Sequence, residues 1–240
     1  MVKQGFQFKQ FFIEHTHCAM KVGTDSIMLG SWVVPNKPQR ILDIGTGSGL
    51  LAIMLAQKVS DKCDIYGIDI DEIAIEQARL NGRNSPWYQQ LSFEHKPLQE
   101  LSETHQYDLI ISNPPYFTVN SRANKKQSKS TRVNARQTLT LEHQVLLKQV
   151  RNNLSLGGIF YCVLPFDLAS GFIECAQSMG LFCIKELHVS TKPEKVAIRI
   201  LLAFSTNITP KVIEKINIYN ELGEYSAEYC FLCKDYYLNF

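Results

Sequence analysis

The residues best suited to chemistry are Asn113-Pro114-Pro115-Tyr116, which directly follow the apolar run Tyr107 to Ser112. The Asn113 amide oxygen and the Pro114 carbonyl oxygen are acceptors that can each take one N–H of a planar amino group. Such a nitrogen is a poor nucleophile because its lone pair is delocalised, and two accepted hydrogen bonds favour the charge that develops as it reacts. The prolines hold these acceptors without adding competing N–H donors, and the Tyr116 ring can stack an extruded base. This turn therefore predicts chemistry at a planar exocyclic nitrogen.

A glycine-rich string lies upstream, at the end of the apolar run Arg40 to Ile44 and before a helical pattern that begins at Leu50. A dinucleotide fingerprint would need a third glycine at position 50, so GxGxxG fails while D-x-G-x-G-x-G holds. That pattern resembles motif I of the class I methyltransferases, whose turn cradles the methionine and ribose of S-adenosylmethionine. The resemblance assigns cofactor binding to Asp43, Gly45, Thr46, Gly47 and Gly49.

Asp69 lies 24 residues after Gly45, at the end of a second apolar run from Asp64 to Ile70. An acidic side chain at that place can accept hydrogen bonds from ribose hydroxyls. We therefore expect Asp69, with the neighbouring Ile70, to contact the cofactor. The residues after the third strand, Phe93 to Leu98, lack the acid that many relatives use near the adenine, and that contact stays open.

The NPPY string resembles motif IV of methyltransferases that act on planar exocyclic or amide nitrogens. In that resemblance Asn113 to Tyr116 are catalytic, and Asn113 also contacts the cofactor. Adenine N6, guanine N2 and protein glutamine methyltransferases share this motif or a close variant, so the motif leaves the substrate undecided.

The segment before the first strand narrows the choice. Lys21-Val22-Gly23-Thr24-Asp25 and its surroundings resemble the start of the bacterial tRNA(Val) adenine-37 N6-methyltransferases, in which this loop closes over the cofactor. Thr24 or Asp25 can cap a helix from Ser26 to Val33, whose free N–H groups suit a carboxylate such as that of methionine. A purely structural capping role is the alternative for Thr24 and Asp25.

Positive charge is concentrated directly after the NPPY string. The segment from 122 to 136 holds six basic residues and no acidic one, so of 25 lysines and arginines 19 remain elsewhere against 23 acids. Uncompensated cations beside a catalytic turn suit the phosphates that flank a target base in tRNA. The predicted nucleic-acid contacts are Arg122, Lys125, Lys126, Lys129, Arg132 and Arg136.

Apolar strand patterns alternate with helical ones from residue 39 onward, which predicts an α/β fold with a mostly parallel, doubly wound sheet. The last two strands, near 181–189 and 196–204, are too close for a crossover helix and should be antiparallel neighbours. With the Rossmann-like methyltransferase resemblance we expect seven strands in one domain over 1–240. An N-terminal extension over 1–38 would cover the cofactor, and 117–138 would form a basic loop.

Composition excludes several classes of protein. The chain shows no signal-peptide pattern and no apolar stretch long enough for a membrane span, so we expect a cytoplasmic protein. The seven cysteines, an odd number, are scattered along the chain and do not form the paired framework typical of disulfides. Cys230 and Cys233 form a single CxxC without the second ligand pair that a zinc site needs, so a helical core pair and no metal are expected.

The favoured function is therefore transfer of a methyl group from S-adenosylmethionine to adenine N6 in tRNA. A glutamine N5-methyltransferase acting on release factors and an rRNA guanine N2-methyltransferase remain alternatives. Release-factor enzymes carry a sizeable helical domain ahead of motif I, whereas roughly 40 residues precede Asp43 here. A DNA adenine methyltransferase would commonly need a recognition domain for the duplex, which this length does not offer.

Overall fold

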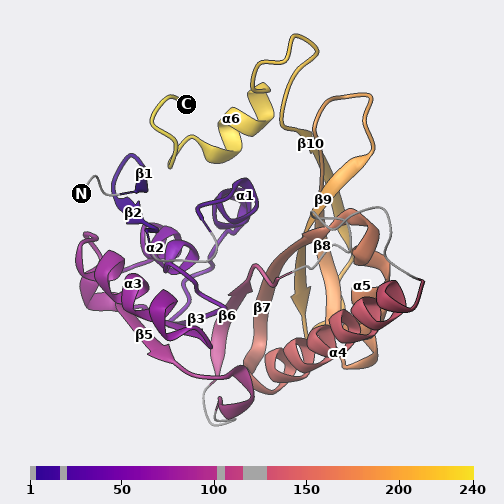
Figure 1. The fold of residues 1–240 in the computed structure, drawn as a ribbon, viewed down its shortest axis with the longest axis horizontal. Coiled ribbons are helices and arrows are strands. Elements are labelled where there is room, and N and C mark those ends of the chain that lie inside the picture. Colours follow the sequence, from indigo (N-terminus) through magenta and orange to yellow (C-terminus); the bar gives the residue numbers. More distant parts are fainter. Residues whose placement is uncertain (1–3, 17–20, 102–105, 116–128) are drawn as a thin grey trace.

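The computed structural model describes residues 4–16, 21–101, 106–115 and 129–240, with the backbone alone between 129 and 140. Tyr116 and the basic residues Arg122, Lys125 and Lys126 lie outside this part. A large sheet runs through the centre in the order β10-β8-β9-β7-β6-β3-β4-β5 (Figure 1). Its strands in chain order are β3 (Arg40–Ile44), β4 (Asp64–Asp69), β5 (Leu91–His95), β6 (Tyr107–Ser112), β7 (Leu154–Pro165), β8 (Phe182–Ser190), β9 (Ala197–Ser205) and β10 (Val212–Asn217).

Strand directions agree with the mostly parallel sheet that the sequence predicts. The neighbouring pairs β5–β4, β4–β3, β3–β6 and β6–β7 are parallel. Strand β9 runs antiparallel to both of its neighbours, β7 and β8. The predicted count of seven strands was wrong, because β10 adds an eighth strand parallel to β8. Most β10 side chains are exposed and an ion pair joins Glu214 to Lys185 at 3.0 Å. An exposed edge strand leaves little apolar signal in the sequence.

Helices cover both faces of the sheet, as expected for a doubly wound fold. Side chains from α1, α2 and α3 share one buried apolar cluster, and side chains from α4 and α5 share the other. In β9, Leu201 and Ala203 face the first cluster while Ile200 and Leu202 face the second, which follows from the two-residue period of a strand. The helices are α1 (Thr24–Trp32), α2 (Leu50–Ala56), α3 (Glu72–Arg83), α4 (Lys129–Asn153), α5 (Ala169–Ser178) and α6 (Ala227–Cys233), with short 3-10 turns η1 (Tyr88–Gln90), η2 (Leu98–Glu100) and η3 (Phe166–Leu168).

Helix α4 begins earlier than predicted. The sequence pattern placed a helix from about Leu141 and a loop over 117–138, but residues 129–138 of that segment are helical. Apolar periodicity detects only the part of a helix that packs on a core, here around Leu146, Leu147 and Val150. The preceding turns contain lysine, arginine, alanine and glutamine, which favour helix without contributing to that pattern.

The N-terminal segment packs against α3 and contacts the C-terminal segment. Strands β1 (Gly5–Gln7) and β2 (Phe12–Glu14) form a hairpin, which the Asn81 side chain joins to α3 through both backbone groups of Glu14. Lys9 Nζ donates to the carbonyl oxygens of Lys234 and Phe240.

Within the described part of the chain, none of the helices combines the length and the apolar character needed to cross a membrane.

Helix α1 is fixed at its C-terminal end. Lys58 Nζ donates to the carbonyl oxygens of Ser31 at 2.6 Å and Val33 at 2.7 Å, and a cation at this end also suits the helix dipole.

Cys230 and Cys233 lie on α6 as free thiols, Cys233 buried and Cys230 half-buried, which agrees with the predicted helical pair.

Candidate active site

The chemistry-bearing residues meet at one edge of the sheet. Strands β5, β4, β3 and β6 are parallel neighbours, so their carboxyl ends lie side by side. The glycine turn follows β3, Asp69 ends β4 and Asn113 follows β6. Open α/β sheets bind ligands at this edge, and the topology thus assembles the three sequence signals in one place.

The glycine turn has the backbone that its sequence requires. Gly45, Gly47 and Gly49 have φ angles of 69°, 55° and 81°, in the left-handed region that side chains disfavour. A Cβ atom at Gly45 or Gly47 would meet no atom of the described chain within 4 Å, so this backbone borders open space. At Gly49 it would instead approach the Phe93 ring at 3.1 Å. Two glycines therefore leave room for a ligand and the third allows close packing.

Asp69 holds this turn in place. Its Oδ2 accepts the Gly47 N–H at 2.9 Å and its Oδ1 accepts the Asp71 N–H at 3.0 Å. Each carboxylate oxygen has a second lone pair that can accept another donor. The adjoining Ile70 side chain is 73% exposed, and its carbonyl oxygen lies 3.0 Å from His95 Nε2 at the end of β5. An acceptor and an apolar surface therefore lie next to each other, and His95 was not predicted there.

Asp43 is a buried carboxyl at the end of β3. Its Oδ2 accepts from Thr46 Oγ1 at 2.6 Å and from the Ala52 N–H at 3.1 Å, whereas Oδ1 is buried with no hydrogen-bond partner among the described residues. Burial raises the pKa of Asp43 to about 7; the Thr46 and Ala52 hydrogen bonds lower it and the Asp69 charge raises it. A donor or cation at Oδ1 would satisfy this group.

The pKa of Asp43 predicts how stability depends on pH. Because its folded pKa lies above the ordinary 3.8, the unfolded state ionises first, so the contribution of Asp43 to stability should fall between pH 3.8 and about 7 and stay level above that. The full shift corresponds to about 4 kcal/mol. Denaturant unfolding of the ligand-free protein across this range should show a flatter dependence for Asp43→Asn. The exposed control Asp61→Asn should keep the wild-type slope, and equal slopes for wild type and Asp43→Asn would contradict the assignment.

Asn113 lies at the carboxyl end of β6 with its orientation fixed. Its Nδ2 donates to Ser26 Oγ of α1 at 2.9 Å, while its Oδ1 is buried without a hydrogen-bond partner in the described chain. The preceding Ser112 donates to the Ile44 carbonyl oxygen at 2.8 Å and ties β6 to the end of β3. Pro114 is buried and Pro115 exposed. Ser26 was not predicted as a site residue, although it directly follows the KVGTD string.

The segment 21–24 leads into the N-terminus of α1. Gly23 is the N-cap residue and no side chain of the described residues caps the helix, so the predicted capping by Thr24 or Asp25 was wrong. The helix begins two residues earlier than predicted, which places both residues inside its first turn. Asp25 Oδ2 instead accepts from Arg199 Nε at 2.8 Å. Lys21, Gly23 and Thr24 are exposed and Val22 is half-buried.

The basic segment is divided by the start of α4. Lys129, Arg132 and Arg136 belong to the first turns of this helix. Their spacings of three and four residues place their backbone positions on one helical face. The predicted contacts at Arg122, Lys125 and Lys126 lie outside the described residues, as does Tyr116.

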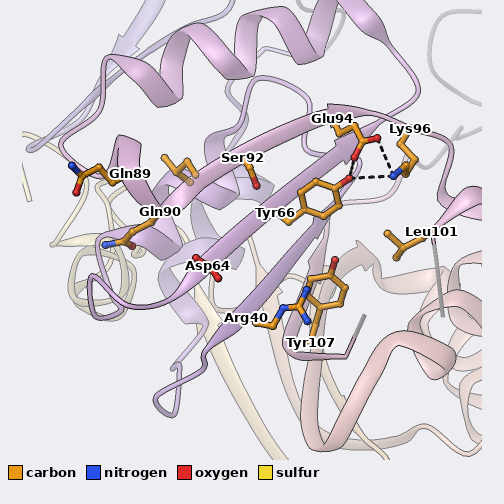
Figure 2. A pocket seen from close by; sticks show the side chains of 11 residues that line it. Arg40, Asp64, Tyr66, Gln89, Gln90, Ser92, Glu94, Lys96, Leu101 and Tyr107 are labelled. Carbon is orange, nitrogen blue, oxygen red and sulfur yellow. Dashed lines mark hydrogen bonds and ion pairs between the residues drawn. The ribbon is translucent and has the colours of Figure 1, made fainter. Parts of the chain in front are cut away.

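A cavity of about 480 Å³ lies away from this edge. Figure 2 shows it on the face of β3 to β6, with Arg40 beside Tyr107 and with Tyr66, Glu94 and Lys96 joined to one another. Lys96 Nζ lies 2.9 Å from Glu94 Oε1, and Tyr66 donates to the same carboxylate. Those bonds lower the pKa of Glu94. The charged groups of this cavity largely satisfy one another. We therefore place the site at the carboxyl edge, where Asp43 and Asn113 each carry an acceptor without a partner among the described residues.

The chain resembles known proteins in sequence and in fold. The family model described as methyltransferase small domain matches residues 15–153. A protein of Pseudoalteromonas atlantica named tRNA1(Val) (adenine(37)-N6)-methyltransferase is 50% identical over the full length of both chains. A Yersinia enterocolitica protein of the same name is 38% identical over 98% of this chain and 93% of that one. Among solved structures, a predicted O-methyltransferase from Agrobacterium tumefaciens superposes with a TM-score of 0.70 over 88% of this chain and 96% of that one at 13% identity, which shows the fold.

Proposed function

Since this chain belongs to the family of the tRNA1(Val) (adenine(37)-N6)-methyltransferases, we propose that its carboxyl-edge site methylates N6 of adenine 37 in a valine tRNA, with S-adenosylmethionine as methyl donor. The observation that carries this assignment within the site is the buried Asn113 Oδ1, an acceptor without a partner in the described chain at the end of β6. A planar amino group supplies the N–H donor that this oxygen lacks.

The residues of the edge suit the cofactor. Open space borders the backbone at Gly45 and Gly47, and Asp43 Oδ1 is a buried acceptor that a cationic amino group would satisfy. We assign Asp69 to the ribose hydroxyls and the exposed Ile70 to an apolar contact. The uncapped start of α1 suits the methionine carboxylate. The full proposed cofactor set is Lys21, Val22, Gly23, Thr24, Asp43, Gly45, Thr46, Gly47, Gly49, Asp69, Ile70 and Asn113.

The chain's own groups prepare the amine for reaction. The cofactor supplies an electrophilic methyl group bound to a sulfonium sulfur. Asn113 Oδ1 and the Pro114 carbonyl oxygen would each accept one N–H of adenine N6, which draws the nitrogen toward tetrahedral geometry and stabilises its developing charge. Ser26 keeps the Asn113 oxygen turned into the site, because the Ser26 hydroxyl accepts the hydrogen bond from the Asn113 amide nitrogen. The excess proton leaves to solvent after transfer, and no strong base is required.

The tRNA contact is proposed for the basic residues of 122–136. Replacing Lys125, Lys126 and Lys129 by glutamine should raise the dissociation constant for tRNA and reduce its log–log salt slope by about two to three, because three phosphate contacts are lost. Filter binding at several salt concentrations measures both quantities. The control triple variant at the exposed Lys62, Lys148 and Lys215 should retain the wild-type slope. An unaltered slope in the first variant would place the RNA elsewhere.

The substrate class is decided by a labelling experiment. The protein is incubated with methyl-labelled S-adenosylmethionine and, in separate reactions, with bulk tRNA, rRNA or release factor. Label in tRNA, recovered as N6-methyladenosine after digestion, is the expected result. Label in rRNA guanine or in release-factor glutamine would replace the proposal by one of those activities. Because tRNA is the proposed substrate, we place the enzyme in the cytoplasm.

A further inference from the structure

A second, smaller cavity of about 230 Å³ lies between α1, β9 and the segment that joins β10 to α6. We name it the tyrosine pocket, after the residues that define it: Asp25, Ile198, Arg199, Tyr219, Tyr225 and Tyr229. Arg199 pairs with Pro165 at the carboxyl end of β7, and β10 ends beside the end of β8. The pocket therefore opens on the same sheet edge as Asn113, two strands further along.

Helix α1 connects the pocket to the proposed catalytic turn. Ser26 accepts the hydrogen bond from Asn113 Nδ2, and the adjacent Asp25 accepts the one from Arg199 Nε. Two consecutive residues of one helix thus contact the catalytic asparagine and the pocket wall. In Figure 1, α6 and its preceding loop lie beyond α1 on the side away from the central strands.

The pocket wall carries an ordered column of aromatic rings. The Tyr225 ring stacks on Tyr219 at 5.2 Å and on Tyr229 at 5.3 Å between ring centroids, with interplanar angles of 24° and 16°. Tyr229 is buried, Tyr219 is half-buried and Tyr225 is 46% exposed. A β-bridge joins Tyr219 to Tyr225, and Ser226 Oγ donates to the Asn217 carbonyl oxygen, so the backbone that carries the rings is fixed.

We propose that the tyrosine pocket binds a nucleobase that neighbours the target adenine in the tRNA, an inference that rests on the proposed function. Aromatic faces stack any base, and a cavity below the size of drug-like sites takes one ring system rather than a whole nucleotide. Because both faces of Tyr225 are covered and Tyr229 is buried, the base would stack on the outer face of Tyr219, at the half-buried end of the column. Arg199, whose guanidinium pairs with Asp25, adds a planar group and the partly exposed Ile198 an apolar face. Single-stranded loops are recognised in this way, with successive bases splayed onto separate surfaces.

Binding of an anticodon stem-loop RNA tests the pocket. Tyr219→Leu keeps an apolar side chain but removes the ring, and we expect the dissociation constant to rise by roughly tenfold or more. Tyr219→Phe should bind as the wild type does. The matched control is Tyr88→Leu, because Tyr88 is 55% exposed on η1 beside β5, at the opposite edge of the sheet. Tyr225→Leu, which removes the ring that supports Tyr219, provides a second pocket variant should Tyr219→Leu prove poorly folded.

RNAs with one abasic nucleotide beside the target adenine test whether the missing base contacts the ring. An abasic site should weaken binding to the wild type and have little further effect on Tyr219→Leu, if base and ring contact each other. Equal abasic losses in both proteins, or wild-type affinity for both pocket variants, would overturn the inference. Loss of release-factor binding in Tyr219→Leu with unchanged RNA affinity would assign the pocket to a protein instead. Failure of the proposed function is distinguishable, because the wild type would then leave tRNA unlabelled.

Discussion

Replacing Asn113 by alanine should lower the rate of methyl transfer by roughly 100- to 1,000-fold, the cost of removing one preorganised acceptor that stabilises transition-state charge. The Asn113 oxygen has no partner in the described chain. Within that part of the chain, the substitution therefore removes one side-chain hydrogen bond, from Asn113 Nδ2 to Ser26 Oγ. S-adenosylmethionine affinity should change little. Single-turnover rates with saturating tRNA, together with cofactor titration by calorimetry, separate these two quantities.

Ser26→Ala is the control that separates orientation from chemistry. It leaves the Asn113 amide in place but removes the acceptor that holds its nitrogen, so the rate should fall less than in Asn113→Ala. The double variant should be no slower than Asn113→Ala alone, because Ser26 would act only through Asn113. Substantial turnover in Asn113→Ala would remove this residue from its proposed role.

The parts of the site that the sequence predicts are those determined by local backbone. Gly45 and Gly47 lie in a strand-to-helix turn whose left-handed φ angles only glycine adopts readily, so residue type and position identify the turn directly. Asp69 and Asn113 end apolar runs, and the carboxyl ends of parallel strands necessarily share an edge. Local patterns and a parallel topology are therefore sufficient to bring these side chains together.

The parts that were missed depend on contacts between distant segments. Asp25 resembles a helix cap in the sequence, but its carboxylate instead pairs with Arg199, 174 residues away. Ser26 acquires its role only because α1 packs beside the end of β6. The stacking of Tyr225 between Tyr219 and Tyr229 likewise requires the turn after β10. Neither apolar periodicity nor motif spacing records pairings of this kind.

The cofactor assignment of Asp69 predicts the second large effect. Charge-assisted hydrogen bonds contribute about 1.5–3 kcal/mol, so Asp69→Ala should weaken S-adenosylmethionine binding by roughly 10- to 150-fold. The structure gives this loss two sources, since the carboxylate both anchors the Gly47 N–H and is proposed to accept a ribose hydroxyl. Affinity for tRNA should stay close to that of the wild type, because Asp69 is proposed to contact the cofactor and not the RNA.

A cofactor analogue without the ribose 2′-hydroxyl separates the two sources. The wild type should bind S-adenosylmethionine more tightly than the analogue, whereas Asp69→Ala should bind both with similar affinity, since the partner of the hydroxyl is gone. Asp71→Ala is the matched control, because Asp71 caps α3 through Ile73 and Ala74. It should lose about 1 kcal/mol of stability and keep the preference for the hydroxyl. If Asp69→Ala also keeps that preference, Asp69 only shapes the glycine turn, and the ribose must be bound by another residue.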